Sequence, residues 1–210
     1  MERFGGVFLV AGLMFFVFAF VAMAAIPYVH FMNLPIKTAE ELAPTVLDDF
    51  KDLERRYPQA FATAFPGGAT IASCAQALRE GRDAYIAEAC WHCHSQFVRP
   101  VSNEDARWGK ISAAGEYHNE LQLPQLLGTR RVGPDLTREA GVHSNDWQIA
   151  HLFNPRNVSP TSVMPPFPWF FNPAVGDQVP APNRRGLSVV TYVQWLGSWI
   201  PLEERNHVAQ

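Results

Sequence analysis

Two cysteines and two histidines lie within five consecutive residues near the middle of the chain. The stretch reads Cys90-Trp91-His92-Cys93-His94 and matches the pattern C-x-x-C-H, the attachment motif of c-type haem. In this motif the two thiols form thioether bonds to the porphyrin, and the histidine that follows ligates the iron. The spacing therefore predicts one covalently bound haem c, held by Cys90 and Cys93, with His94 as the first axial ligand.

Two other chemistries also use closely spaced cysteines. A structural zinc site needs a further pair of Cys or His residues at ligand spacing, and Cys74 is the only other cysteine in the chain. A thioredoxin-like dithiol lies in a βαβ pattern, which is absent from this sequence. Both alternatives are weaker than haem c, and Cys74 is expected to be a free, buried cysteine.

The second axial position of a haem iron is filled by Met or His, or stays open. Four of the five methionines lie within the first 32 residues, so Met164 is the candidate outside the N-terminal region. It lies in a loop that flanking prolines stiffen, and we expect it to be the sixth ligand. The remaining histidines are weaker candidates, and His151, after a short helix predicted to begin at Ser144, is expected to pack or to form hydrogen bonds. The other four are His92, His118, His143 and His207.

Side chains around the haem are also expected to orient the ligands and bind the propionates. Pro134 lies between the two proposed ligands, and its carbonyl is predicted to accept a hydrogen bond from Nδ1–H of His94. A plain turn at this Gly-Pro dipeptide is the alternative. Arg99, Arg130 and Arg131 could pair with the propionates, because a guanidinium matches a carboxylate in a bidentate pair. Exposure to solvent is an equally good explanation for each arginine alone.

Two helices are expected to support this site. Residues 81–90 place apolar side chains at helical spacing after Gly81. The glycine allows another helix to approach closely at this position. Residues 187–196 place four apolar side chains on one face by the spacing i, i+3, i+4, i+7. The two helices are predicted to pack together. The four side chains are those of Val189, Tyr192, Val193 and Leu196.

Charged residues make up 18% of the chain, whereas about 25% is typical of globular proteins. The shortfall lies in residues 4–36, which contain no Asp, Glu, Lys or Arg. Within them, residues 5–26 are apolar and would span roughly 33 Å as a helix, enough to cross the hydrocarbon core. A cleaved signal peptide is the alternative, but its apolar core is shorter and its N-terminal region more basic. The net charge of −3 gives no overall basic field for nucleic acid.

The chain is expected to divide into four parts. These are a transmembrane anchor with its exit (1–36), a juxtamembrane segment (37–74), a monohaem cytochrome c domain (75–200) and a polar tail (201–210). In the juxtamembrane segment Thr45 is predicted to cap an amphipathic helix that reaches Tyr57. Its apolar face would pack on its own domain or dock on a membrane partner.

Several blocks of residues resemble subunit II of the cbb3-type cytochrome c oxidases, a family of membrane-anchored monohaem cytochromes c. They occur in the order found in that family and extend from Gly81 to Trp169. The blocks are Gly81-Arg82-Asp83-x-Tyr85-Ile86, Cys90-x-x-Cys93-His94-Ser95-Gln96-x-x-Arg99-Pro100, Ala114-Gly115-Glu116, Arg131-x-Gly133-Pro134-Asp135-Leu136, Trp147-x-x-Ala150-His151-Leu152-x-Asn154-Pro155-Arg156 and Met164-Pro165-x-x-Pro168-Trp169.

The resemblance implies that Cys90 and Cys93 bind haem c and that His94 and Met164 ligate its iron. It also implies that the protein lies in membrane lipid beside a catalytic haem-copper subunit. Electrons would come from another cytochrome c subunit or a soluble cytochrome c, and oxygen would be reduced in the partner. With the patterns above, the expected fold is all-α, with a single N-terminal transmembrane helix followed by a class I cytochrome c-type haem domain.

Haem attachment of this type takes place outside the cytoplasm, so a single-pass protein of the bacterial inner membrane with a periplasmic haem domain is expected. Two alternatives remain. One is the cytochrome c subunit of a nitric oxide reductase or of another respiratory complex. The other is a catalytic or gas-sensing haem domain in which Met164 can be displaced.

Overall fold

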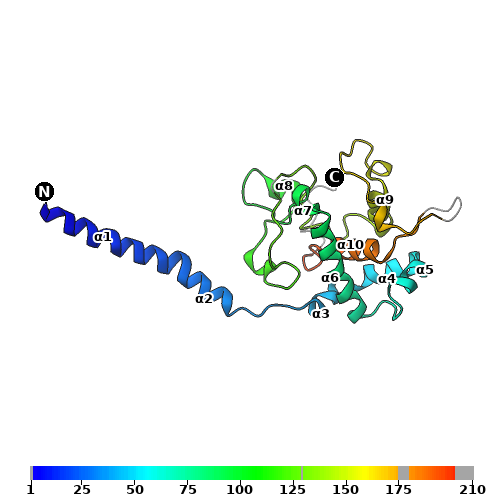
Figure 1. Ribbon diagram of the computed structural model, residues 1–210, viewed down its shortest axis with the longest axis horizontal. Coiled ribbons are helices and arrows are strands. Elements are labelled where there is room, and N and C mark those ends of the chain that lie inside the picture. Colours follow the sequence, from blue (N-terminus) through cyan, green and yellow to red (C-terminus); the bar gives the residue numbers. More distant parts are fainter. Residues whose placement is uncertain (1, 129, 175–179, 202–210) are drawn as a thin grey trace. The chain divides into compact units, whose positions relative to one another are not determined.

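The computed structural model describes residues 2–128, 130–174 and 180–201, with only the backbone of residues 2 and 3. His207 and nearly all of the expected polar tail lie outside this range. Every regular element in the described residues is a helix, and β-structure there is limited to two isolated bridges, so the predicted all-α fold is confirmed (Figure 1). The contacts divide the chain into two compact units, residues 1–36 and 37–210.

The first unit is a single apolar helical run. It comprises α1 (Glu2–Phe20), the π-helical turn η1 (Val21–Ala25) and α2 (Ile26–Met32). In the described chain, Phe4–Met32 is the one helix that is long and apolar enough to cross a membrane, with a mean hydropathy of 2.7. The helix continues past Pro27 to Met32, because the π-helical turn just before the proline changes the hydrogen-bond register.

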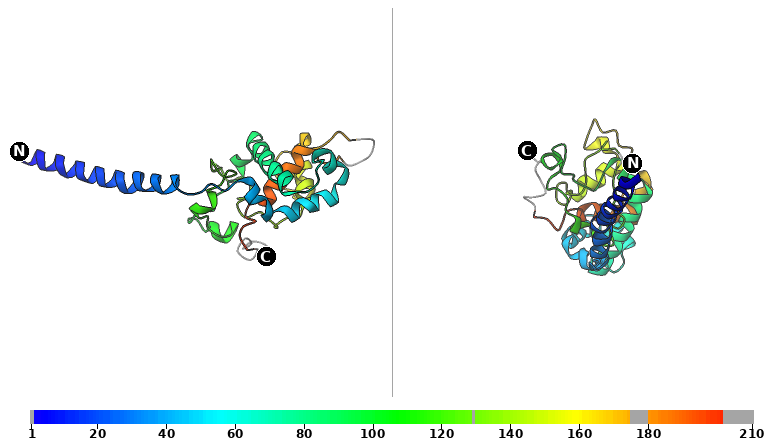
Figure 2. Two further views of the ribbon diagram at one scale, coloured as in Figure 1. Left: turned by 90° about the horizontal axis from the view of Figure 1, so that it is seen from below. Right: turned by 90° about the vertical axis from the view of Figure 1, so that its left-hand side faces the viewer.

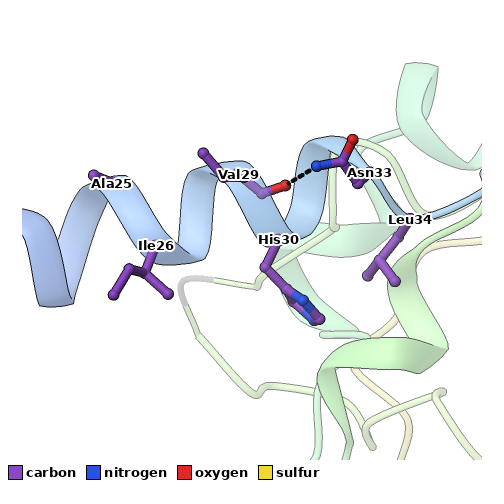
Figure 3. A pocket seen from close by; sticks show the side chains of 6 residues that line it. All are labelled: Ala25, Ile26, Val29, His30, Asn33 and Leu34. Carbon is purple, nitrogen blue, oxygen red and sulfur yellow. Dashed lines mark hydrogen bonds between the residues drawn. The ribbon is translucent and has the colours of Figure 1, made fainter.

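Polar groups gather where this helix ends. The Asn33 side-chain amide donates to the carbonyl of Val29 over 2.7 Å, as Figure 3 shows. The side chains of Ile26 and His30, four residues apart, point to the same side of the helix in that view. An imidazole and an amide at the end of an apolar run suit the interface between hydrocarbon and water.

Two long helices cross at the centre of the second unit. They are α6 (Ile71–Ala87) and α10 (Arg184–Trp195), which form its largest helix–helix interface (Figures 1 and 2). A Cβ atom at Gly81 would lie 2.0 Å from the carbonyl oxygen of Ser188 and 2.7 Å from Cβ of Tyr192. The rings of Tyr85 and Tyr192 then meet with their centroids 5.5 Å apart. The predicted helix pair and the role of Gly81 in it are confirmed.

The helix α6 begins ten residues before the predicted helix over 81–90. Thr70 and Ser73 cap it reciprocally: Ser73 N–H donates to Oγ1 of Thr70 at 3.2 Å, and Thr70 N–H donates to Oγ of Ser73 at 2.9 Å. Cys74 in its first turn is free and fully buried, as predicted, and burial raises the pKa of its thiol to about 12. The expected division after Cys74 thus falls inside a continuous helix.

Short helices before α6 pack on the same core. These are α3 (Ala39–Leu42), η2 (Ala43–Thr45), α4 (Leu47–Arg56) and α5 (Pro58–Ala64). Phe50, Phe61 and Phe65 are buried together, with ring centroids 4.8–5.2 Å apart. The apolar face of α4 therefore packs on its own domain. The predicted cap at Thr45 is wrong, because its hydroxyl donates to the carbonyl of Leu42 and stays within η2.

The remaining elements are short, and the first of them carries the two cysteines of the motif. They are α7 (Cys90–Cys93), α8 (Glu104–Trp108), η3 (Ala114–Tyr117), α9 (Asn145–Phe153), η4 (Pro155–Asn157) and η5 (Pro168–Phe170). Ser144 caps α9 as predicted, because its hydroxyl accepts from Trp147 N–H at 3.3 Å. Polar contacts tie the start of α9 to α4: Tyr57 donates to Asp146 at 2.9 Å and Asn145 to Asp52 at 3.0 Å.

The helix crossing can be tested with Gly81→Ala. Alanine favours a helix over glycine by about 1 kcal/mol, but its Cβ would collide with the backbone of α10. We expect a net loss of about 1–3 kcal/mol in the free energy of unfolding, measured by urea unfolding of the full chain in detergent and followed by circular dichroism. Gly67→Ala is the matched control, because a Cβ there meets no atom within 4 Å. Equal free energies for the two variants would contradict the close crossing.

Candidate haem site

The two thiols of the motif lie on α7, a single helical turn. Ala89 has a left-handed conformation (φ of 56°) and turns the chain out of α6 into α7. Cys90 and Cys93 are three residues apart, so they lie on the same side of this turn. Both thiols are free; Cys90 is half-buried and Cys93 is exposed. Burial, with a contribution from the charge of Glu88, raises the pKa of the Cys90 thiol to about 12.

Both central helices donate hydrogen bonds to the residues at the end of the motif and just after it. The Tyr85 hydroxyl of α6 donates to the carbonyl of His94 at 2.7 Å. The Tyr192 hydroxyl of α10 donates to Oε1 of Gln96 at 3.1 Å, and the N–H of Gln96 donates to the carbonyl of Leu126 at 3.0 Å. The main chain of the proposed ligand His94 is thus bonded to α6, and the side chain of Gln96, two residues later, is bonded to α10.

The His94 ring has one nitrogen engaged. Its Nδ1 lies 2.9 Å from the carbonyl oxygen of Pro134, and because a carbonyl can only accept, Nδ1 carries the proton and Nε2 keeps a lone pair. Gly133 packs directly on the ring, since a Cβ there would lie 2.2 Å from Cε1. Burial lowers the pKa of His94, which favours the neutral imidazole that a metal requires.

Met164 lies against α9, on the side chain of His151. Its Sδ is 3.1 Å from Nε2 of His151, and the thioether is half-buried at the edge of the core. Burial, together with the electrostatic effect of His94, lowers the pKa of His151 to about 4. A positive charge on the His94 ring therefore disfavours a positive charge on His151.

The arginines expected near the propionates differ in their surroundings. Arg131 is mostly buried and pairs with Glu104 at 2.9 Å and with Asp135 at 3.3 Å. Its Nε and Nη1 groups are buried and have no partner among the described residues. Arg99 is half-exposed and pairs with Glu104 at 2.8 Å, and Arg130 is exposed. Arg131 thus retains free donors for an anion, whereas Nε of Arg99 is already engaged by a carboxylate.

Two of the remaining histidines have other contacts. The His92 ring is exposed and stacks on Trp91 with centroids 3.9 Å apart. Nδ1 of His143 lies 2.6 Å from a carboxylate oxygen of Glu139. Both were expected to be weaker candidates for the sixth ligand, and these contacts leave that expectation a prediction. The main-chain carbonyl of His118 accepts a hydrogen bond from the N–H of Lys37.

Some residues at the site gave no clear signal in the sequence. Glu104 is a buried carboxylate that binds Arg99 and Arg131 together, and no motif marks it. The contact of His151 with Met164 was also missed. The sequence there does carry a signal, because His143, Trp147 and His151 recur every four residues, and Trp147 and His151 share one face of α9.

These groups suit a haem. The thiols could anchor a porphyrin edge, and the buried donors of Arg131 suit a carboxylate of its rim. His94 and Met164 could provide two axial donors, the number left open by an iron that a porphyrin holds in its plane. In the described part of the chain, no group of three or more His, Cys, Asp or Glu side chains could hold a metal ion by itself.

Comparison with known proteins agrees with this geometry. Residues 67–198 match the family described as "Cytochrome C oxidase, mono-heme subunit/FixO". A search of the curated proteins gave no match. The matched range covers more than half of the chain, from the turn before α6 to the end of α10, and contains the C-x-x-C-H motif and Met164. This confirms the resemblance seen in the residue blocks: the chain belongs to the FixO family of mono-haem subunits of cytochrome c oxidase.

Proposed function

We propose that this chain is the electron-transfer subunit of a membrane respiratory complex. It receives electrons on one covalently bound haem c and passes them to a haem-copper subunit, where oxygen is reduced. The observation that carries the proposal is the pairing of two free thiols on α7 with a neutral imidazole whose Nε2 lone pair is available. The family match supports a haem and an oxidase complex.

Each residue of the site has a role in this proposal. Cys90 and Cys93 anchor the porphyrin, and His94 and Met164 ligate the iron. The Pro134 carbonyl keeps the His94 ring in the tautomer that presents Nε2. The haem supplies a one-electron redox couple, and two protein ligands leave no position for a substrate on the iron.

The propionates are assigned to the two arginines at the buried carboxylate Glu104. Arg131 offers Nε and Nη1, which are buried without a partner among the described residues. Arg99 lies beside it on the same carboxylate and is more exposed. An anion bound there is shielded from water on the Arg131 side, where a charge-assisted hydrogen bond is strongest.

The apolar helix over Phe4–Met32 anchors the protein in the inner membrane of a bacterium. Haem attachment through C-x-x-C-H places the second unit in the periplasm and the N-terminus in the cytoplasm. The electron donor is another cytochrome c subunit or a soluble cytochrome c. The single helix holds the haem domain close to the acceptor at the membrane surface.

Met164→Leu tests the sixth ligand. Leucine fills a similar volume but has no sulfur, so the iron should become high-spin or take another ligand, and carbon monoxide should bind faster than to the wild type. The absorption spectrum and carbon monoxide binding of the purified full chain check this. Met14→Leu, in the apolar helix, is the control. An unchanged low-spin, methionine-ligated spectrum in Met164→Leu would remove the assignment.

Gly133→Ala tests the position of the His94 ring. The new Cβ would lie 2.2 Å from Cε1, so the ring must move away from the Pro134 carbonyl and the bond from His94 to iron should weaken. We expect covalent haem content to persist, because the thiols are unaffected, while the fraction of low-spin iron falls. Gly115→Ala, where a Cβ meets no atom within 4 Å, is the control. Identical low-spin fractions in the two variants would count against this arrangement.

The partner can be identified by purification of the full chain in mild detergent. We expect a larger polytopic subunit with haem and copper to copurify, and its removal to abolish oxygen uptake while the haem c stays reducible. Mass spectrometry and metal analysis check both points. A chain that remains alone in every mild detergent, with all of its haem reducible, would argue against the complex.

A further inference from the structure

One contact in the site that has no role so far joins Met164 to α9. The Sδ atom of Met164 lies 3.1 Å from Nε2 of His151, close for a contact with sulfur. A thioether has lone pairs but no proton, so Nε2 must carry the hydrogen and donate it to the sulfur. The other nitrogen, Nδ1, is buried with no partner among the described residues.

Stacking fixes the ring that makes this contact. The His151 ring lies nearly parallel to Trp147, at an interplanar angle of 10° and a centroid distance of 4.6 Å. The ring of His143, just before α9, also stacks on Trp147, with a centroid distance of 3.7 Å. Trp147 therefore stacks with both histidines, so the His151 ring cannot tilt without disturbing Trp147.

The helix itself is braced from a distant part of the chain. Asp146, in the first turn of α9, accepts from Tyr57 at 2.9 Å and pairs with Arg56, and Asn145 donates to Asp52 of α4 at 3.0 Å. The stack on Trp147 and the hydrogen bonds between α9 and α4 together fix the position of the Nε2 donor of His151.

We propose that His151 is a positioning residue for the iron ligand Met164, to which it donates a hydrogen bond from Nε2. The inference rests on the proposed haem function. A thioether sulfur has two lone pairs, so one can bind iron while the other accepts from His151. The hydrogen bond selects which lone pair faces the iron, and it draws electron density away from the sulfur.

This hydrogen bond has a predictable electronic effect. When the sulfur donates less electron density, the ferric state of the iron is destabilised more than the ferrous state. The hydrogen bond therefore raises the reduction potential of the haem. A single neutral hydrogen bond typically changes an equilibrium by about threefold to tenfold. Loss of the hydrogen bond should lower the equilibrium constant for one-electron reduction of the haem by this factor. This corresponds to a fall of about 30–59 mV in the midpoint potential.

The test uses the full chain in detergent with haem attached. His151→Phe keeps an aromatic ring for the stack and removes the donor, while His151→Gln keeps an N–H donor. His143→Phe is the matched control, because it changes the other histidine ring that stacks on Trp147. The readouts are the midpoint potential and the proton NMR signal of the Met164 methyl group, which the haem ring current shifts strongly upfield when the sulfur is bound.

We expect the methyl signal to remain upfield in all three variants. The midpoint potential should fall in His151→Phe, recover in part in His151→Gln and stay at the wild-type value in His143→Phe. Equal potentials in His151→Phe and His143→Phe would overturn the proposal. If His151→Phe does not fold, as judged by circular dichroism, His151→Leu replaces it in the comparison with His151→Gln.

Failure of the proposed function has a different signature. A wild-type chain without covalent haem, or with a spectrum that Met164→Leu leaves unchanged, would remove the haem or ligand assignment itself. If the sixth ligand is lost in His151→Phe but kept in Met164→Leu, His151 is the ligand and the positioning role is excluded. With haem and methionine ligation intact, an unchanged potential in His151→Phe contradicts only this inference.

Discussion

The close crossing of α6 and α10 is the contact on which the rest of the second unit depends. At Gly81 the two backbones approach so closely that any side chain would meet the carbonyl of Ser188. This approach brings Tyr85 and Tyr192 together, and their hydroxyls reach past the core to His94 and Gln96. The position of the proposed iron ligand is therefore set by helix packing at a glycine more than ten residues away in the sequence.

The region around the proposed ligand His94 contains buried polar groups, and partners within the protein do not fully compensate for the cost of burying them. Burial lowers the pKa of His94 and so favours the neutral ring. Beside it, burial raises the pKa of Asp135, while hydrogen bonds from Thr137 and Phe97 and the charge of Arg131 oppose this rise. A buried ion pair is costly unless its donors and acceptors are all satisfied. Arg131 keeps two unpartnered donors within the described structure, so an anionic group there would complete a network that the protein leaves open.

The segment before the family match contributes to the same fold. Residues 37–66 lie outside the matched range, yet Phe50, Phe61 and Phe65 are part of the common hydrophobic core. This segment also reaches α9, because α4 holds Asp146 in the first turn of that helix. It is therefore a brace for the helix beside Met164 as well as a connection to the apolar helix.

Local patterns in the sequence determined much of this protein. The charge-free run predicted the apolar helix, since a long helix without charges is recognisable by composition alone. The C-x-x-C-H spacing and the glycine before an aromatic predicted the attachment motif and the packed helix pair. The Pro134 carbonyl could also be proposed as the acceptor for His94, because proline leaves its carbonyl free of a competing ladder.

Contacts between distant residues could be decided only by the tertiary structure. The start of α6 at Ile71 depends on a capping box and on burial of Cys74, and the failure of Thr45 as a cap depends on a competing carbonyl. Glu104 binds two arginines, and His151 contacts Met164. No local pattern in the sequence relates the members of either group. Spacing along the chain determines which side chains share a helix face, whereas the partner of a side chain across a loop is determined by how the whole core packs.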